Sequence, residues 1–534
     1  MRRIWMVGIL VAVATVAGAA GYQRGAHWKR FDYTGTRLKA DLGTPDAVVR
    51  TASLSALPRD LLKAPVARDV LTEDLVFYYE QHEDRLGLRG AFRRIAYEHQ
   101  LGWSDRVLQS AFDEPAELAF WRDGKGALRH FAMVMRRNAL ATLLQQAAQI
   151  AMKDQQLTLA GEIDANGEKL KVFALALHPR RTLLLVAQGK RLVVLSDPGL
   201  LYDGGNKPVP AAQQAIAEWL ARDGVLASRF ALEEPGAAAG ERGVPRHTLA
   251  VGAPALALGY DSFVPALRGI RLDFRAGWTT SAWIDGKAWS AAGGGLAALW
   301  RAAPANPAAC VAMPVDWQAA VSLVAAAERK PALPSPAALA SLSGPALACW
   351  YGESRLHAPV FIARLAGKPG ERNAALSALA DWAMAVPAGS LPAAAAGDGP
   401  RLLWQAEAGA DDTALRPALA AHGAYVAFSP DGRLVNQVIA ALARKLPSVA
   451  DQMPAGDATL GVVTPRRMAA MAEREAYDAL SGAGEANLRG AAQSHLPARM
   501  KALSAYPAVR LDLAAPAGTG GWRRLDWHAA RGTK

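Results

Sequence analysis

Alternation of apolar and polar positions predicts several strands in the first half of the chain. Apolar residues alternate on both sides of Asp123-Gly124 and of Asn166-Gly167, which are dipeptides typical of hairpin turns. Around and between these turns, alternating or continuous apolar runs predict strands at 118–120, 131–135, 157–163, 169–177, 182–186 and 192–195. Ser196-Asp197-Pro198 then has the composition of a helix start.

Helical spacing of apolar residues is found elsewhere. Residues 54–97 carry apolar positions three to five apart among dense charge, and 138–152 contain neither Gly nor Pro, so we expect helices in both stretches. Two apolar runs end in proline, at Pro314 and at Pro465, and each leads into a helical pattern. Proline suits the first turn of a helix, because the N–H that it lacks has no partner there. These two sites are predicted strand-to-helix corners.

Two short sequence echoes suggest an internal duplication. Residues 121–125 (WRDGK) resemble 283–287 (WIDGK), and 192–198 (LVVLSDP) resemble 425–431 (YVAFSPD). Independent convergence on the same turn chemistry explains echoes of this length equally well.

Stretches rich in Ala, Gly, Pro or Ser mark the expected linkers, at 233–245, 330–345 and 386–400. We expect an α+β protein in which an N-terminal transmembrane or signal helix precedes antiparallel sheets with packed helices in two similar lobes. The predicted regions are an anchor or signal at 1–30, a helical region at 31–115, a first α+β lobe at 116–232, a second α+β region at 246–385 and a C-terminal α+β region at 400–534.

The N-terminal segment predicts the cellular address. Met1-Arg2-Arg3 precedes an uncharged stretch at 4–21, which as a helix would be about 27 Å long, close to the roughly 30 Å of a bilayer core. The stretch also contains Ala17-Gly18-Ala19, a pattern that a signal peptidase accepts, so cleavage after Ala19 is the alternative to an uncleaved anchor. We expect a single-pass protein of the bacterial inner membrane with its body in the periplasm.

Charge and cysteine content add little about partners. The formal net charge is +12, but the basic residues are scattered in pairs, so a solvated surface is expected and no nucleic acid partner. The two cysteines, Cys310 and Cys349, each lie in a strand-like apolar stretch. A disulfide in an oxidising compartment and two separately buried thiols both fit this placement.

Candidate chemistry is sparse, and the sequence predicts no catalytic, cofactor-binding or metal-ligating residue. The signatures HExxH, GxSxG, SxxK and GxxxxGK[ST] are absent. His82 lies in the polar cluster 78–85, one or more helical turns before Glu98-His99, but adjacent residues on a helix point in different directions, so a solvated helix face is expected. The turn chemistry of aspartate explains Asp123, Asp285 and Asp431. The fifteen tryptophans fit a buried core or a carbohydrate-stacking groove.

Residues 41–99 (DLGTPDAVVRTASLSALPRDLLKAPVARD…AYEH) and 117–131 (ELAFWRDGKGALRHF) resemble a family of bacterial envelope proteins, domain of unknown function 2138. The resemblance covers most of the chain and the N-terminal apolar segment. Members of that family are commonly encoded beside alpha-2-macroglobulin-like proteins, so the resemblance implies an accessory role in the envelope with such a protein as partner. It implies no catalytic residue.

Three functional hypotheses follow. The first is a non-enzymatic binding or scaffold protein, anchored to the inner membrane and acting with an envelope partner; it predicts an exposed groove or apolar patch. The second is a periplasmic hydrolase of unrecognised type that uses residues such as His82, His99 or Asp123. The third is a structural protein that binds peptidoglycan or lipid through its basic surface.

Overall fold

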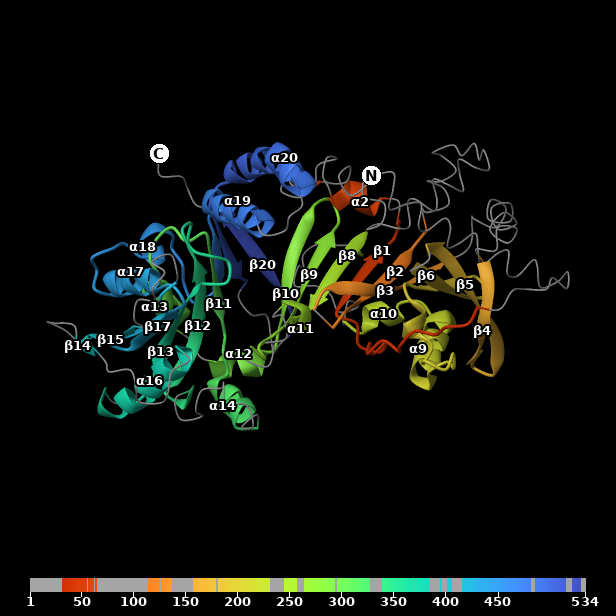
Figure 1. Ribbon diagram of the computed structural model, residues 1–534, viewed down its shortest axis with the longest axis horizontal. Coiled ribbons are helices and arrows are strands. Elements are labelled where there is room, and N and C mark those ends of the chain that lie inside the picture. The colour runs from red at the N-terminus through yellow and green to blue at the C-terminus, as the bar shows by residue number, and fades with distance from the viewer. Residues whose placement is uncertain are drawn as a thin grey trace. The chain divides into compact units, whose positions relative to one another are not determined.

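The computed structural model describes residues 31–54, 56–61, 63–64, 114–124, 126–136, 157–178, 181–230, 244–256, 264–292, 295–326, 339–367, 369–384, 394–395, 401–405, 415–481, 486–514 and 521–529 (Figure 1). The chain divides into two compact units, Met1–Gly259 with Gly269–Thr280 and Tyr260–Arg268 with Ser281–Lys534. Both units mix helices with antiparallel strands, so the protein is an α+β protein with an extensive antiparallel sheet.

The elements of the first unit are β1 (Ala47–Thr51), α2 (Leu57–Leu61), β2 (Ala116–Arg122), β3 (Leu128–Arg136), β4 (Leu157–Ala165), β5 (Glu168–His178), β6 (Arg181–Gln188), β7 (Arg191–Leu195), the 3-10 helix η1 (Pro198–Leu200), α9 (Pro210–Ala221), α10 (Val225–Ser228), β8 (His247–Gly252), α11 (Ala253–Leu256) and β9 (Leu267–Phe274). The chain leaves this unit within β10 (Trp278–Ile284).

The elements of the second unit are α12 (Gly286–Ala292), α13 (Leu296–Trp300), β11 (Ala309–Met313), α14 (Trp317–Ala326), β12 (Leu342–Trp350), β13 (Val360–Leu365), α16 (Pro369–Ala383), β14 (Ala394–Ala395), β15 (Arg401–Gln405), β16 (Ala418–His422), β17 (Tyr425–Ser429), α17 (Gly432–Leu442), α18 (Val449–Gln452), β18 (Thr459–Val463), α19 (Pro465–Ser481), α20 (Ala486–Ser504), β19 (Val509–Leu513) and β20 (Gly521–Ala529).

The strands of the two units follow the same spatial order. In the first unit the order is β9-β8-β1-β2-β3-β7-β6-β5-β4. In the second it is β19-β18-β11-β12-β13-β17-β16-β15-β14. Each strand of the first list has a counterpart with the same position in the sheet and the same place in the chain order. The topology of the first unit is therefore repeated in the second.

The register of pairing is repeated as well. Residues that face each other across two strands of the first unit have equivalents that face each other across the corresponding strands of the second. The central strands of both sheets are therefore paired in the same register. The matching pairs are Val48–Ala119 with Cys310–Cys349, Ala47–Val251 with Ala309–Val463, Glu117–Val134 with Leu347–Ile362, and Val134–Val193 with Ile362–Ala427. This equivalence allows a residue-by-residue comparison of the two units.

The structural equivalence of the two units corrects both similarities noted in the sequence. Asp197 accepts a hydrogen bond from the backbone N–H of Gly199 and caps η1, while Asp431 accepts one from Arg433 and caps α17. The two caps are equivalent, so the true alignment of β7 with β17 is shifted by one residue from the echo. The other echo joins unlike sites, because 121–125 run from β2 into a hairpin whereas 283–287 run from β10 into α12.

Several predicted elements are confirmed. The hairpins around Asp123-Gly124 and Asn166-Gly167 join β2 to β3 and β4 to β5. Asn166 adopts a φ of 56° and Gly167 a φ of 84°, the left-handed values that make this dipeptide favourable in a tight hairpin turn. Both strand-to-helix corners are present, with α14 after β11 and α19 after β18.

The expected linkers are partly wrong. β12 begins at Leu342, inside the stretch 330–345, and β14 lies inside 386–400. Pro345 is tolerated within β12 because the ladder to β13 is irregular between Ser343 and Leu347, where a missing N–H costs no ladder bond. The helices expected over 138–152 and over most of 54–97 lie outside the described residues, as does the segment 4–21. Among the helices that are described, none is long and apolar enough to cross a membrane.

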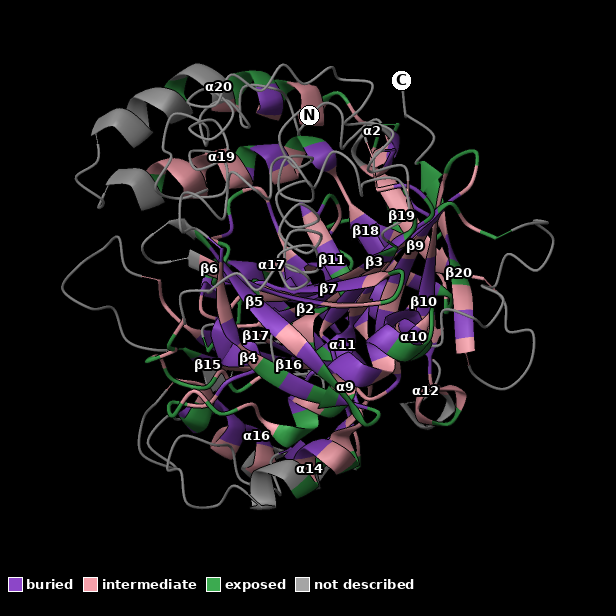
Figure 2. Ribbon diagram, turned by 90° about the vertical axis from the view of Figure 1, so that its right-hand side faces the viewer, coloured by how far each residue is buried: buried purple, intermediate pink, exposed green. Residues whose placement is uncertain are grey.

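Burial is concentrated in the strands, which carry most of the buried positions in Figure 2. The runs 183–186 and 192–195 of β6 and β7 are fully buried on both faces, which explains why their sequences are continuously apolar rather than alternating. In the second unit α13, α17 and α18 pack on one face of the sheet, and α14 and α16 pack on part of the opposite face.

Candidate functional site

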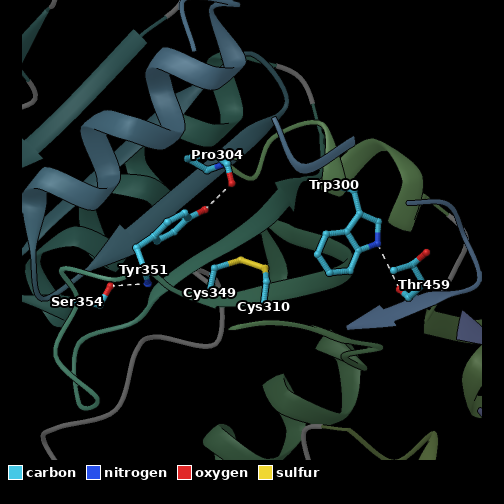
Figure 3. The surroundings of a disulfide bond; sticks show 7 residues. All are labelled: Trp300, Pro304, Cys310, Cys349, Tyr351, Ser354 and Thr459. Atoms are coloured by element: carbon cyan, nitrogen blue, oxygen red, sulfur yellow. Dashed lines mark hydrogen bonds between the residues drawn. A yellow bond between two sulfur atoms is a disulfide. The ribbon is translucent and has the colours of Figure 1, made fainter. Parts of the chain in front are cut away.

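A disulfide links the two cysteines in the second unit. Cys310 on β11 and Cys349 on β12 are directly opposed, with Cα atoms 4.0 Å apart, and both are fully buried. Figure 3 shows the bond lying between Trp300 and Tyr351. The disulfide is thus the alternative that the structure supports over two separate thiols. Such bonds persist in oxidising compartments.

The polar groups of the aromatic side chains around the disulfide form hydrogen bonds. The Tyr351 hydroxyl donates to the carbonyl of Pro304 at 3.0 Å, and the Trp300 indole N–H donates to the carbonyl of Thr459 at 3.2 Å (Figure 3). Burial raises the pKa of Tyr351 well above its usual value. This phenol therefore stays neutral and acts as a structural donor rather than an acid.

The opposite face of the same sheet carries a continuous row of apolar residues, which we call the apolar row. Its members are directly opposed across neighbouring strands from β20 to β17, and opposed residues share one face of a sheet. The apolar row consists of Trp527, Leu511, Gly461, Val311, Ala348, Phe361 and Phe428.

Part of the apolar row is open to solvent. Trp527 is 57% exposed, Val311 46% and Phe361 40%. On the same face, α14 and α16 cover the start of β12 and the strand β16. Single exposed apolar residues are ordinary, but three in one cross-strand row form a surface suited to binding. The apolar row is not evident from the sequence, because its members come from seven strands that are up to about two hundred residues apart.

The first unit contains a buried polar cluster made of Thr51, Asp60 and His247. The hydroxyl oxygen of Thr51 lies 2.7 Å from His247 Nδ1, and His247 Nε2 lies 3.0 Å from a carboxylate oxygen of Asp60. All three side chains are essentially inaccessible. Lys63 and Arg246 also pair with the Asp60 carboxylate, at 2.8 and 3.3 Å.

Burial and neighbouring cations shape the ionisation of this cluster. Burial lowers the pKa of His247, and the charges of Arg246 and Lys63 act in the same direction against the attraction of Asp60. Burial alone would raise the pKa of Asp60, but its bonds to Lys63 and His247 outweigh that effect and lower it. A neutral His247 donates from Nε2–H to Asp60, and its Nδ1 faces the Thr51 hydroxyl, whose single proton is shared between Nδ1 and the Ser53 carbonyl at 2.8 Å.

The cluster has the residue types of a nucleophile–base–acid triad but not an accessible geometry. Phe274 and Trp278 stack against the His247 ring, at centroid distances of 5.6 and 6.5 Å. With Thr51 only 2% exposed, no substrate reaches its hydroxyl in this conformation. The arrangement fixes α2 to the sheet, since the Trp278 indole also donates to the Asp60 carbonyl at 2.8 Å.

A second polar network occurs in both units. In the first, Thr248 donates to Asp273 at 2.6 Å and Arg271 pairs with the same carboxylate at 2.8 Å. The second unit repeats the arrangement: Thr459 donates to Asp512 at 2.8 Å and Arg510 pairs with Asp512 at 2.6 Å. The strands that carry these groups read IRLDF at 270–274 and VRLDL at 509–513, a third echo that our sequence analysis missed. Its repetition marks this network as part of the shared framework.

The aspartates singled out from the sequence act locally. Asp123 accepts a hydrogen bond from the N–H of Ala127 within the hairpin. Asp285 accepts hydrogen bonds from the N–H groups of Lys287 and Ala288 at the start of α12. Together with the cap formed by Asp431, these contacts match the turn chemistry that the sequence predicts.

The aromatic residues divide between core and surface. Tyr351, Trp404 and Trp522 are buried, whereas Trp350 is half-buried and Trp527 is exposed. The cluster 78–85 and Glu98-His99 lie outside the described residues, so the hydrolase hypothesis built on His82 and His99 stays a prediction. Within the part of the chain that is described, no group of three or more His, Cys, Asp or Glu residues is arranged to hold a metal ion.

Comparison with known proteins places the chain in a family. It is 29% identical over 523 residues to the uncharacterized protein YfaA of Escherichia coli (strain K12), covering 92% of this chain and 91% of that protein. No solved structure matches. The model of a family described as uncharacterized proteins conserved in bacteria, DUF2138, matches residues 4–530. The chain therefore belongs to the DUF2138 family.

Proposed function

We propose that this protein is a periplasmic binding or scaffold protein, anchored in the bacterial inner membrane through residues 4–21, that acts with an envelope protein partner. The Cys310–Cys349 disulfide supports the compartment, because such a bond persists where thiols are oxidised. The two units, with their common strand order and register, would be copies of one ancestral domain that supply a broad framework.

The observation that carries the binding role is the apolar row. Its exposed members lie on the sheet face opposite α13, α17 and α18, and no ionisable side chain interrupts it. A surface of this kind buries apolar side chains of a partner and favours a protein over a polar polymer or a nucleic acid. The partner that the family resemblance implies is an alpha-2-macroglobulin-like protein.

A binding experiment with a defined partner tests the proposal. The full-length protein and the alpha-2-macroglobulin-like protein of the same bacterium are purified, mixed and examined by crosslinking and by titration. We expect the wild type to bind and Phe361→Ser to weaken binding at least tenfold, since Phe361 is an exposed aromatic member of the apolar row. Leu128→Ser, which removes an equally exposed apolar side chain from β3, is the matched control and should bind as the wild type does.

Failure of the wild type to bind would remove this partner, and equal weakening by both substitutions would remove the apolar row as the site. The cellular location is tested separately. Mass spectrometry of the mature N-terminus distinguishes a retained anchor from cleavage after Ala19, and fractionation shows whether the body is periplasmic.

A further inference from the structure

A pocket of about 240 Å³ lies in the first unit at one end of its sheet, where β1 and β3 end and β2 and β7 begin. Its ionisable lining consists of three arginines and two carboxylates, namely Arg50, Arg136, Arg191, Glu117 and Asp223. Val134, Met135 and Pro115 supply an apolar wall.

Most of these charges are already paired with one another. Asp223 forms ion pairs with Arg136 and with Arg191, and Arg191 also donates to the carbonyl of Leu220 at 2.8 Å. The hydrogen bond from Arg136 and the charges of both arginines lower the pKa of Asp223, so this carboxylate is ionised and neutralised in place. Glu117 accepts a hydrogen bond from the N–H of Leu226 at 3.2 Å, and its burial raises its pKa.

Arg50 differs from the other two arginines. Within the part of the chain that is described, its side chain makes no hydrogen bond or ion pair, although it is half-buried and lies opposite Glu117 across β1 and β2, where its charge acts to lower the pKa of the Glu117 carboxyl at longer range. A guanidinium has five N–H donors in a planar fork that matches the two oxygens of a carboxylate or phosphate. A half-buried guanidinium that lines a pocket without a direct partner is therefore a ready anchor for an oxyanion.

The internal repeat shows that this pocket is a departure from the shared framework. The residues equivalent to Arg50 and Glu117 in the second unit are Ala312 and Leu347, which are also directly opposed. Those two residues are buried in the apolar core beneath α17. The same position in the sheet therefore holds two buried apolar side chains in the second unit and two half-buried, oppositely charged side chains in the first. Stability does not require the charges there, because the second unit does without them.

We propose that this pocket binds the terminal oxyanion group of a small ligand, with Arg50 as the residue that holds it. The pocket lies below the 300–1,000 Å³ common for drug-sized ligands, so a short carboxylic acid or a phosphate fits and an oligosaccharide or peptide does not. The excess of arginines over carboxylates disfavours a cation. The proposal concerns the first unit alone and is independent of the apolar row.

Titration calorimetry of the full-length protein with succinate and, separately, with inorganic phosphate tests this site, at constant ionic strength set with sodium chloride. We expect saturable binding of at least one probe, and the better probe identifies the carboxylate or phosphate class. Arg50→Gln should abolish binding. Arg129→Gln makes the same charge change on β3 at a side chain that is 75% exposed and outside the pocket, and it should leave affinity unchanged.

Arg50→Lys keeps the charge and loses the fork, so it should bind about tenfold more weakly, and it serves as the second variant if Arg50→Gln fails to fold. Absence of binding by both probes would overturn the proposal. Equal losses in Arg50→Gln and Arg129→Gln would also overturn it, because long-range charge would then be the cause.

Discussion

Single residues in the first unit show how buried charge is compensated locally. The Asp60 carboxylate is inaccessible, yet it is contacted by Lys63, Arg246 and His247. Removing one partner of such a group leaves uncompensated charge, which costs more than the bond itself contributes. The cluster therefore makes the stability of the first unit sensitive to the protonation of His247.

His247→Gln tests this sensitivity. Gln is expected to lower the free energy of unfolding by about 1–3 kcal/mol at pH 7.5, since it reproduces the two hydrogen bonds imperfectly. Because the folded state lowers the pKa of His247, the unfolded chain takes up a proton near pH 6.5 that the folded chain resists. The free energy of unfolding of the wild type should therefore keep its full contribution from His247 above pH 6.5. Below pH 6.5 it should decrease, by at most about 1.4 kcal/mol per pH unit. Urea unfolding from pH 7.5 to 5.5 measures both profiles.

The wild-type profile should be the steeper of the two. Thr51→Val is the matched control, because it removes the hydroxyl that contacts Nδ1 and keeps the imidazole, so it should be destabilised but retain the wild-type slope. Parallel profiles for the wild type and His247→Gln would show that His247 does not couple to folding.

Residues differ in how far the sequence predicts their roles. The cap at Asp197 is predictable, because the residues that it contacts are its immediate neighbours. The Asp60–His247 contact joins residues 187 apart, and nothing in the local pattern of either one distinguishes a buried ion pair from a solvated one. Arg50 is similar, since only its comparison with Ala312 in the equivalent strand reveals that its position is unusual.

Pairs of elements in the second unit are fixed covalently as well as by the sheet. The disulfide between β11 and β12 closes a loop with a sequence separation of 39 residues. On the chain-entropy model, a loop of this length stabilises the fold by about 4 kcal/mol. The double substitution Cys310→Ala with Cys349→Ala should lower the free energy of unfolding of the second unit by about that amount.

Urea unfolding with and without reductant measures this effect. Reduced wild type should match the double variant, and the variant should be insensitive to reductant. A wild type whose unfolding curve does not shift on reduction would contradict the prediction, as would two titratable thiols in the unfolded, unreduced protein.

Elements are predictable from sequence where their own residues carry the signal. The β2–β3 and β4–β5 hairpins follow from alternation and turn dipeptides, because both signals are local. The pairing of β1 with β8, or of β11 with β18, joins segments on either side of a whole α/β stretch, and no local pattern encodes it. Short echoes misled us at 121–125, since a hairpin and a helix cap both use Asp-Gly.

At the scale of the whole molecule, the chain consists of one topology used twice with different chemistry. Both units share the strand order, the capping aspartate after β7 and β17, and the Thr–Asp–Arg network. The charged pocket and the His247 cluster belong to the first unit, and the disulfide and the apolar row belong to the second. This division indicates that each unit has specialised on a common framework.

Hydrogen exchange tests whether the units also fold separately. In the second unit the disulfide lies within a core supplied by α13, α17, α18 and their own sheet. Loss of the disulfide should therefore speed amide exchange in β11, β12, β13 and β18 and leave β1, β2 and β3 unchanged, because local opening follows the cooperative unit to which a contact belongs. The comparison uses the oxidised wild type and the double cysteine variant, read by mass spectrometry of peptides from each strand. Faster exchange of equal size in the first unit would mean that the two repeats form one cooperative structure, in which case a stability change in either would alter both the pocket and the apolar row.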